Sequence, residues 1–281
     1  MSGRAARALR RDRRVLAAGV LLVMLAGATA LAAVLLPDPV AQTADGRLLG
    51  PGWTHPFGTD ELRRDVAART FAGLRSSLVT ILLAVVPGAI AGTALGLAAG
   101  VLGRLVDGLL MRVIDAWLAF PGLLIALAVL AITGPGRWGV GVTLFLFVIP
   151  SFARLARAQA RSEMTREYVL AAQALGASRL RIGLNHVARN AWDPLLTHLA
   201  LMLAVALFIE SALSFLGLGV QAPAPSLGGM INASRQYLRE SPVYLLGPAA
   251  ALSCIVLSLN LLVDALQDAF SGRGSAGLKG R

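Results

Sequence analysis

The chain has 281 residues, of which 56% are hydrophobic and only 15% charged, and its mean hydropathy is +0.70. Soluble domains usually carry about a quarter charged residues and under half apolar ones, so this composition argues against a soluble protein. The net charge of +11 would suggest nucleic-acid binding in a soluble chain, but here the basic residues lie between long apolar runs. Such residues set the orientation of membrane helices, so an all-α membrane protein without a nucleic-acid partner is expected.

The first apolar run covers residues 15–36 and follows a basic tail, residues 1–14, with six arginines. A cleaved signal peptide begins in the same way, but its apolar region has only about 7–15 residues. This run is uncharged throughout and ends at Pro37. It predicts a retained transmembrane helix with a cytoplasmic N-terminus, followed by an extracytoplasmic loop over 37–75.

Five more uncharged runs follow, at 76–103, 116–136, 138–153, 194–209 and 241–263. A span needs roughly 20 residues to cross the hydrocarbon, so the two runs at 138–153 and 194–209 need flanking residues to complete one. Six spans are predicted, with five or seven as alternatives. The core then covers 76–270, with an outer loop at 211–240 and a cytoplasmic tail at 271–281.

Arginine positions support this orientation. The segment 154–193, which six spans place in the cytoplasm, carries seven arginines, whereas the proposed outer turn at 133–138 carries one. In the outer loop 37–75 five arginines are matched by five acidic residues. The distribution satisfies the positive-inside rule.

Small residues recur every four positions in the second run, at Gly88, Gly92, Gly96 and Gly100. This spacing places them on one helix face, where they allow close approach of a second backbone. The face is interpreted as static helix packing, with a mobile interface lining a path as the alternative.

Residues 167–178 of the cytoplasmic segment predict a compact pair of helices. The run from Glu167 to Leu175 consists of good helix formers with an acid in its first turn. Gly176 suits the left-handed position after a helix, and Ser178 suits the N-cap of a second helix over 179–187. The pair is too short and polar to span, so a docking site for another protein is expected. An amphipathic helix on the lipid headgroups is the alternative.

The order Glu, Ala-Ala, Leu-Gly-Ala-Ser, Arg-Ile, His in this segment resembles the EAA loop of ABC importer permeases. In that family the loop forms coupling helices that insert into a cleft on the ATPase subunit. The resemblance implies a coupling role for a set of residues across the segment. They are Glu167, Tyr168, Ala171, Ala172, Leu175, Gly176, Ala177, Ser178, Arg181, His186 and Asn190.

Two further motifs resemble the outer loops of C-type permeases of the dipeptide, oligopeptide and nickel importers. One runs from His55 to Asp65 and the other from Glu210 to Ser226. With the EAA loop they extend the resemblance over most of residues 15–270. The residues that carry them are Phe57, Gly58, Thr59, Asp60, Arg64, Asp65, Glu210, Ser214, Phe215, Leu216, Gly217 and Gly219.

The resemblance implies a type I ABC importer permease fold of about six transmembrane helices in the cell membrane, with both termini cytoplasmic. It implies partners: a homologous second permease, two ATP-binding subunits and an extracytoplasmic substrate-binding protein, besides membrane lipid. ATP and Mg would be bound by the partner ATPases, leaving no cofactor in this chain. Peptides are the expected cargo, with nickel or glutathione as alternatives, and the substrate contacts stay undefined.

Three positions depart from the family pattern. Arg63 stands where the family usually has glycine, Ala188-Arg189 where it has Leu-Pro, and Leu227 where many relatives have tryptophan. These departures bear on the first outer turn, the start of the fifth span and the late outer loop.

No enzymatic site is predicted. The only lysine, Lys279, is followed by Gly280, so no phosphate-binding loop of the GxxxxGK[ST] type exists. His186 and His198 have no nearby cluster of metal ligands, so no metal site is expected. Glu210, at the end of the fifth run, is interpreted as structural or gating. A secondary transporter driven by an ion gradient is the alternative class, against which the lack of a repeat or a central charge argues.

Overall fold

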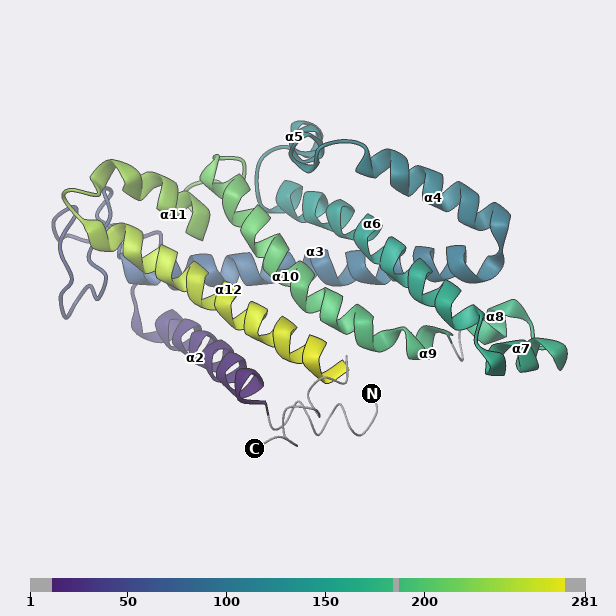
Figure 1. The fold of residues 1–281 in the computed structure, drawn as a ribbon. Helices are drawn as coiled ribbons and strands as arrows, with labels where there is room; N and C mark the ends of the chain where they lie inside the picture. Colours follow the sequence, from purple (N-terminus) through teal and green to yellow (C-terminus); the bar gives the residue numbers. More distant parts are fainter. Residues whose placement is uncertain (1–11, 184–186, 271–281) are drawn as a thin grey trace.

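The computed structural model describes residues 12–183 and 187–270, which form helices joined by loops (Figure 1). One isolated bridge, Thr59 to Asp65, is the only strand-like pairing in these residues, so the all-α prediction is confirmed. The helices are α2 (Arg13–Leu35), α3 (Val66–Leu102), α4 (Arg104–Leu118), α5 (Gly122–Thr133), α6 (Arg137–Met164), α7 (Glu167–Ala174), α8 (Arg179–Ile182), α9 (Ala188–Asn190), α10 (Trp192–Phe215), α11 (Leu227–Ser234) and α12 (Pro242–Phe270), with a 3₁₀ turn at Arg235–Tyr237.

Five of these helices, α2, α3, α6, α10 and α12, are long and apolar enough to cross a membrane. The helices α4 and α5 form a sixth span if they are counted together, although they are bent by 90° relative to each other. The span expected at 116–136 is therefore found as part of a bent pair, with α5 covering Gly122–Thr133. Pro121 explains the break, because proline disfavours helical geometry at the residue before it and has no N–H to donate.

Two helices extend well beyond their apolar runs. The N-terminus of α3 lies ten residues before Ser76, where the Asp65 carboxylate accepts a hydrogen bond of 2.6 Å from the Ala68 N–H and caps the helix. The end of α6 lies eleven residues beyond Ala153, and its added turns carry arginines that pair with α4. Arg157 and Arg161 contact Asp107, and Arg154 lies 2.6 Å from Asp115.

The main packing contact runs between α3 and α6 (Figure 1). A Cβ atom built on Gly92 would lie 2.4 Å from the Ile149 carbonyl oxygen, and one on Gly96 would lie 2.3 Å from the Ala153 carbonyl oxygen. These distances are far below van der Waals contact, so the two backbones touch. The glycine face is thus a packing surface within this chain.

The remaining helices fix the two ends of the molecule. The outer loop and α11 lie at one end of α3, and α7 and α8 lie at the other (Figure 1). The helix α2 runs beside α12, and the Arg14 guanidinium lies 2.5 Å from the Asp268 carboxylate. The start of α2 and the end of α12 therefore lie on the same side, as an even number of crossings requires.

Replacing Gly96 with valine tests the α3–α6 contact. The side chain would overlap the α6 backbone, so we expect a loss of about 1–3 kcal/mol in the free energy of unfolding. Thermal unfolding of the purified protein in detergent measures it. Gly108→Val is the matched control, because a Cβ there meets no atom within 4 Å. Equal melting temperatures for both variants would contradict the packing assignment.

Candidate functional site

The segment after α6 forms a helix–turn–helix at one end of the molecule. The helix α7 ends in a turn in which the Gly176 N–H donates to the Gln173 carbonyl (2.9 Å) and the Ala177 N–H to the Ala172 carbonyl (3.0 Å). Gly176 has a φ of +84°, the left-handed conformation that its position predicts. Ser178 then caps α8 by accepting a hydrogen bond from the Arg181 N–H, which is also as predicted.

An apolar cluster holds this unit, α7–α9, against the ends of α3 and α6. Val169, Ile182 and Val187 are fully buried and pack with Val101 of α3 and Ala160 of α6. The partly buried side chains of Ala172 and Ala177 pack against the same cluster. The small residues of the motif thus let α7 and α8 lie close to the ends of α3 and α6.

A polar cluster joins α6, α7 and α9. The Glu163 carboxylate accepts hydrogen bonds from the Tyr168 hydroxyl (2.6 Å) and from the Asn190 side-chain amide (3.2 Å). That amide also donates to the Tyr168 oxygen at 2.9 Å. The hydrogen bond to Glu163 raises the pKa of the Tyr168 phenol above its usual value, which keeps the hydroxyl protonated and donating.

The sequence singled out Tyr168 and Asn190 but missed Glu163. A signal for Glu163 exists, since the helix dipole disfavours an acid in the last turn of a helix such as α6. An acid placed there is expected to have a hydrogen-bonding partner.

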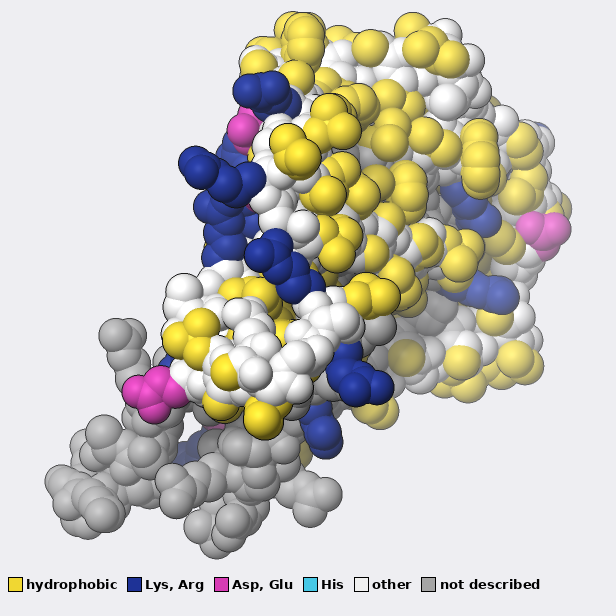
Figure 2. Space-filling model, turned by 90° about the vertical axis from the view of Figure 1, so that its right-hand side faces the viewer, with side chains coloured by type: hydrophobic (Ala, Val, Ile, Leu, Met, Phe, Trp, Pro, Cys, Tyr) yellow, Lys and Arg dark blue, Asp and Glu magenta, His cyan; other side chains and the backbone are white. Residues whose placement is uncertain are grey.

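The outward face of the unit exposes large apolar side chains. Leu175 is 89% exposed, Leu180 61% and Leu170 53%. Figure 2 views this end of the molecule, where arginine side chains in dark blue lie around it. Glu167, Ala171 and Arg181 of the same unit are also exposed. His186 lies outside the described residues. Exposed leucines on a base held by burial and hydrogen bonds are typical of a docking surface.

The first outer motif folds around a fully buried carboxylate. Asp60 accepts hydrogen bonds from the backbone N–H of Leu62 (2.9 Å) and of Arg64 (2.8 Å), and from the Arg64 side chain (2.7 Å). The Thr59 hydroxyl donates to the Gly46 carbonyl at 2.8 Å. Gly58 has a φ of +76°, and a Cβ there would lie 2.0 Å from a backbone oxygen.

His55, the first residue of this motif, joins the loop to the start of α3. Its ring lies 2.6 Å from the Asp65 carboxylate and 2.9 Å from the Asp45 carboxylate. Burial of the ring lowers the pKa of His55, but the two hydrogen bonds outweigh burial and raise it above its usual value. The ring therefore links two acids, one of which caps α3, and the contact is strongest when the ring is protonated.

Arg63 does not change the shape of the first outer turn, although the sequence resemblance implies glycine at this position. It has a φ of +62°, so the turn keeps the left-handed geometry for which glycine is suited. Leu227 is fully buried at the start of α11, and Ala188 and Arg189 form the short α9.

The late outer motif ends α10. Glu210 is buried and accepts hydrogen bonds from the hydroxyls of Ser214 (3.1 Å) and Ser211 (3.4 Å). Gly217, with a φ of +80°, follows the helix end. A Cβ on Gly219 would overlap the Ser214 side chain.

The side chains of Phe215 and Leu216 complete this motif. The Arg235 guanidinium lies 5.1 Å from the centre of the Phe215 ring, and Leu216 is 59% exposed. The two outer motifs thus gather at one end and the α7–α9 unit at the other. Among the described residues, no group of three His, Cys, Asp or Glu could hold a metal ion.

Comparison with known proteins identifies the class. Residues 92–274 match the family described as binding-protein-dependent transport system inner membrane component. A chain of the inward-facing MetNI methionine ABC transporter has the same fold, with a TM-score of 0.53 at 16% identity, covering 69% of this chain and 94% of that chain. The chain belongs to this family of transport proteins and is a multi-pass protein of the inner membrane.

Two relatives extend the similarity over nearly the whole chain. The dipeptide transport system permease protein DppC of Alkalihalophilus pseudofirmus is 38% identical, over 85% of this chain and 79% of that protein. The glutathione transport system permease protein GsiD of Pectobacterium atrosepticum is 34% identical, over 92% of this chain and 87% of that protein. The predicted resemblance to dipeptide transport permeases is confirmed.

The raised pKa of His55 gives the outer loop a pH dependence. The charged ring contributes stability that is fully present below its unfolded value of about 6.5 and is lost as pH rises through the higher folded pKa. We expect hydrogen exchange in residues 45–65 to speed up, beyond the intrinsic rate, as the pH rises above about 6.5. His55→Gln should show no such pH effect beyond the intrinsic rate, and the same pH effect in both proteins would exclude His55 as its source.

The φ of Arg63 predicts that Arg63→Gly is stabilising. The left-handed conformation costs a non-glycine residue about 1–2 kcal/mol, of which the flexibility of glycine in the unfolded chain offsets a part. We expect a gain of about 0.5–1 kcal/mol in thermal unfolding. Arg239→Gly, in an exposed turn of ordinary φ, is the control and should gain nothing. A destabilised Arg63→Gly variant would show that the arginine side chain holds this turn.

Proposed function

We propose that this chain forms one half of the translocation pore of an ATP-driven ABC importer and is driven through the α7–α9 unit. The supporting observation is the exposed face of Leu170, Leu175 and Leu180 on a base fixed to the ends of α3 and α6. An amphipathic helix lying on the lipid headgroups would explain these leucines less well, because they lie on a compact helix–turn–helix that protrudes from the ends of α3 and α6. A cleft on an ATPase subunit that binds the α7–α9 unit would bury these leucines.

In this proposal the chain itself has no enzymatic activity and no cofactor. ATP and Mg are bound by two partner ATP-binding subunits, and their closure displaces α7 and α8. Glu163, Tyr168 and Asn190 prevent α7 from moving independently of α6, so the displacement reaches the spans as a rigid-body motion. A homologous second permease completes the pore.

An extracytoplasmic binding protein is the proposed partner at the opposite end. The outer loop there is held by the buried Asp60 and by His55, which gives a firm surface for docking. Peptides are the proposed cargo, since the DppC relative is named for dipeptide transport. Glutathione, itself a small peptide, is the second candidate because of the GsiD relative.

Replacing Gly176 with valine tests the coupling role. A β-branched residue is strained at a φ of +84°, so the turn should open and Leu175 should lose its position. We expect uptake by the complete transporter in proteoliposomes to fall at least about tenfold, together with stimulation of ATP hydrolysis by the loaded binding protein.

Gly176→Asn is the matched variant, because asparagine tolerates the left-handed conformation and should retain most of the uptake. Wild-type uptake by the valine variant would contradict the coupling role. Uptake by this chain alone, driven by an ion gradient, would instead favour a secondary transporter.

A further inference from the structure

Two arginines line a cavity at the outer-loop end of the molecule. The cavity measures about 540 Å³ and lies between the last turns of α2, the first turns of α3 and residues 224–225. Arg75 comes from α3 and Arg137 is the first residue of α6. Arg137 donates a hydrogen bond of 2.5 Å to the Ser76 hydroxyl, which also lines the cavity.

Two arginines and one aspartate line this cavity, and the buried Glu210 outside its lining interacts electrostatically with Arg137. In the part of the chain that the structure describes, neither Arg75 nor Arg137 forms an ion pair within 4 Å. The only acidic residue that lines the cavity is Asp38. Two guanidinium groups facing one carboxylate favour an anion with several acceptor oxygens.

Both arginines are expected to lie at the same depth in the bilayer, because each directly precedes an uncharged stretch of helix. From Ser76 to Leu102 the helix α3 carries no charge, and from Trp138 to Ala153 the same holds for α6. The hydrocarbon therefore begins directly beyond Arg75 and Arg137, which places the two guanidinium groups among the lipid headgroups.

Arg137 also lines a second, mostly apolar groove between α3 and α6. It measures about 590 Å³ and is lined by Arg137 itself and then by apolar side chains, among them Leu83, Trp138 and Phe145. Gly141 forms part of the groove, and a Cβ there would meet no atom within 4 Å. The cavity with its two arginines and this apolar groove share Arg137 as a lining residue, and side by side they match the two halves of a phospholipid.

We infer that the cavity and the groove together bind one anionic glycerophospholipid. Its phosphate accepts hydrogen bonds from Arg75 and Arg137, and one acyl chain lies between α3 and α6. The helix α2 is only slightly buried against the rest of the chain, so a lipid that fills the space between α2 and α3 would also hold α2 in place. The site is independent of cargo and of the ATPase.

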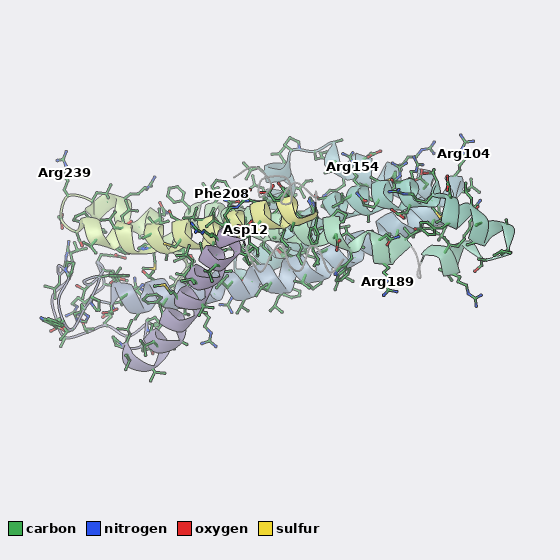
Figure 3. The ribbon with its side chains drawn as sticks, turned by 60° about the horizontal axis from the view of Figure 1, so that its bottom comes forward. Asp12, Arg104, Arg154, Arg189, Phe208 and Arg239 are labelled. Atoms are coloured by element: carbon green, nitrogen blue, oxygen red, sulfur yellow. The ribbon has the colours of Figure 1, made fainter. Side chains whose placement is uncertain are left out.

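Native mass spectrometry of the delipidated full chain, with its co-purifying subunits, tests the inference. Dioleoylphosphatidylglycerol is titrated in and the bound lipid counted. We expect Arg75→Gln and Arg137→Gln each to weaken binding roughly fivefold, by loss of one charge-assisted contact. Arg239→Gln is the matched control, since this exposed arginine lies at the same end but outside the cavity, and it should bind as the wild type does (Figure 3).

The groove is tested separately by Gly141→Leu, whose Cβ would meet no atom within 4 Å and whose side chain would occupy the groove and should also weaken lipid binding. A tenfold excess of inorganic phosphate distinguishes the source of the anion and should not displace the lipid. Displacement by free phosphate, together with an unaffected Gly141→Leu variant, would overturn the lipid assignment. Equally tight binding of dioleoylphosphatidylcholine would overturn the preference for an anionic lipid.

If the glutamine variants fail to fold, the double variant Arg75→Lys and Arg137→Lys keeps both charges and should keep most of the binding. Unchanged binding in correctly folded Arg75→Gln and Arg137→Gln would overturn the site, as would a wild-type protein that takes up no phosphatidylglycerol.

Discussion

Backbone contact between α3 and α6 is the constraint on which the other features depend. Gly92 and Gly96 allow it, because any side chain there would overlap carbonyl groups of α6. In lipid, apolar side chains gain little by leaving the acyl chains, so close van der Waals packing of backbones is the available source of helix association. The helix α3 has 37 residues, about 55 Å in length, which exceeds the hydrocarbon thickness of about 30 Å. Its two ends therefore reach the outer loop and the α7–α9 unit, and α6 reinforces it over most of that distance.

Each end of this helix pair carries a structure that is fixed by polar contacts. At the outer end Asp65 both caps α3 and contacts His55, so the loop is attached to the helix itself. At the other end Glu163 lies in the last turn of α6 and accepts hydrogen bonds from α7 and from the residue that ends α9. These contacts leave little freedom between loop and span. In the proposed mechanism a displacement applied to α7 would therefore be carried by the helices themselves, which is what alternating access by rigid-body motion requires.

The sequence predicted the apolar spans, the left-handed turn at Gly176 and the cap at Ser178, because each depends on local chemistry. It could not predict that α3 begins at Val66, since the cap at Asp65 is stabilised by a loop that folds around Asp60 and His55. The bend between α4 and α5 was missed because an uncharged run has the same composition whether or not it is straight. Glu163 was missed because its partners lie on two other helices. Tertiary contacts decided the start of α3 and the partners of Glu163, whereas the bend follows from Pro121.

The turn at Arg63 keeps its shape because the surrounding loop holds it. The turn between Asp60 and Arg64 keeps a φ of +62° at this position although glycine is replaced. The surrounding contacts explain this, because the Asp60 carboxylate accepts two backbone N–H groups, and the Arg63 carbonyl accepts from the Thr43 N–H at 2.8 Å. A loop held by this many hydrogen bonds can impose a strained backbone angle on an unsuited residue. The geometry of the outer loop is therefore set by its buried aspartate, and the glycine that the resemblance implies at this position would lower the strain of a turn that forms without it.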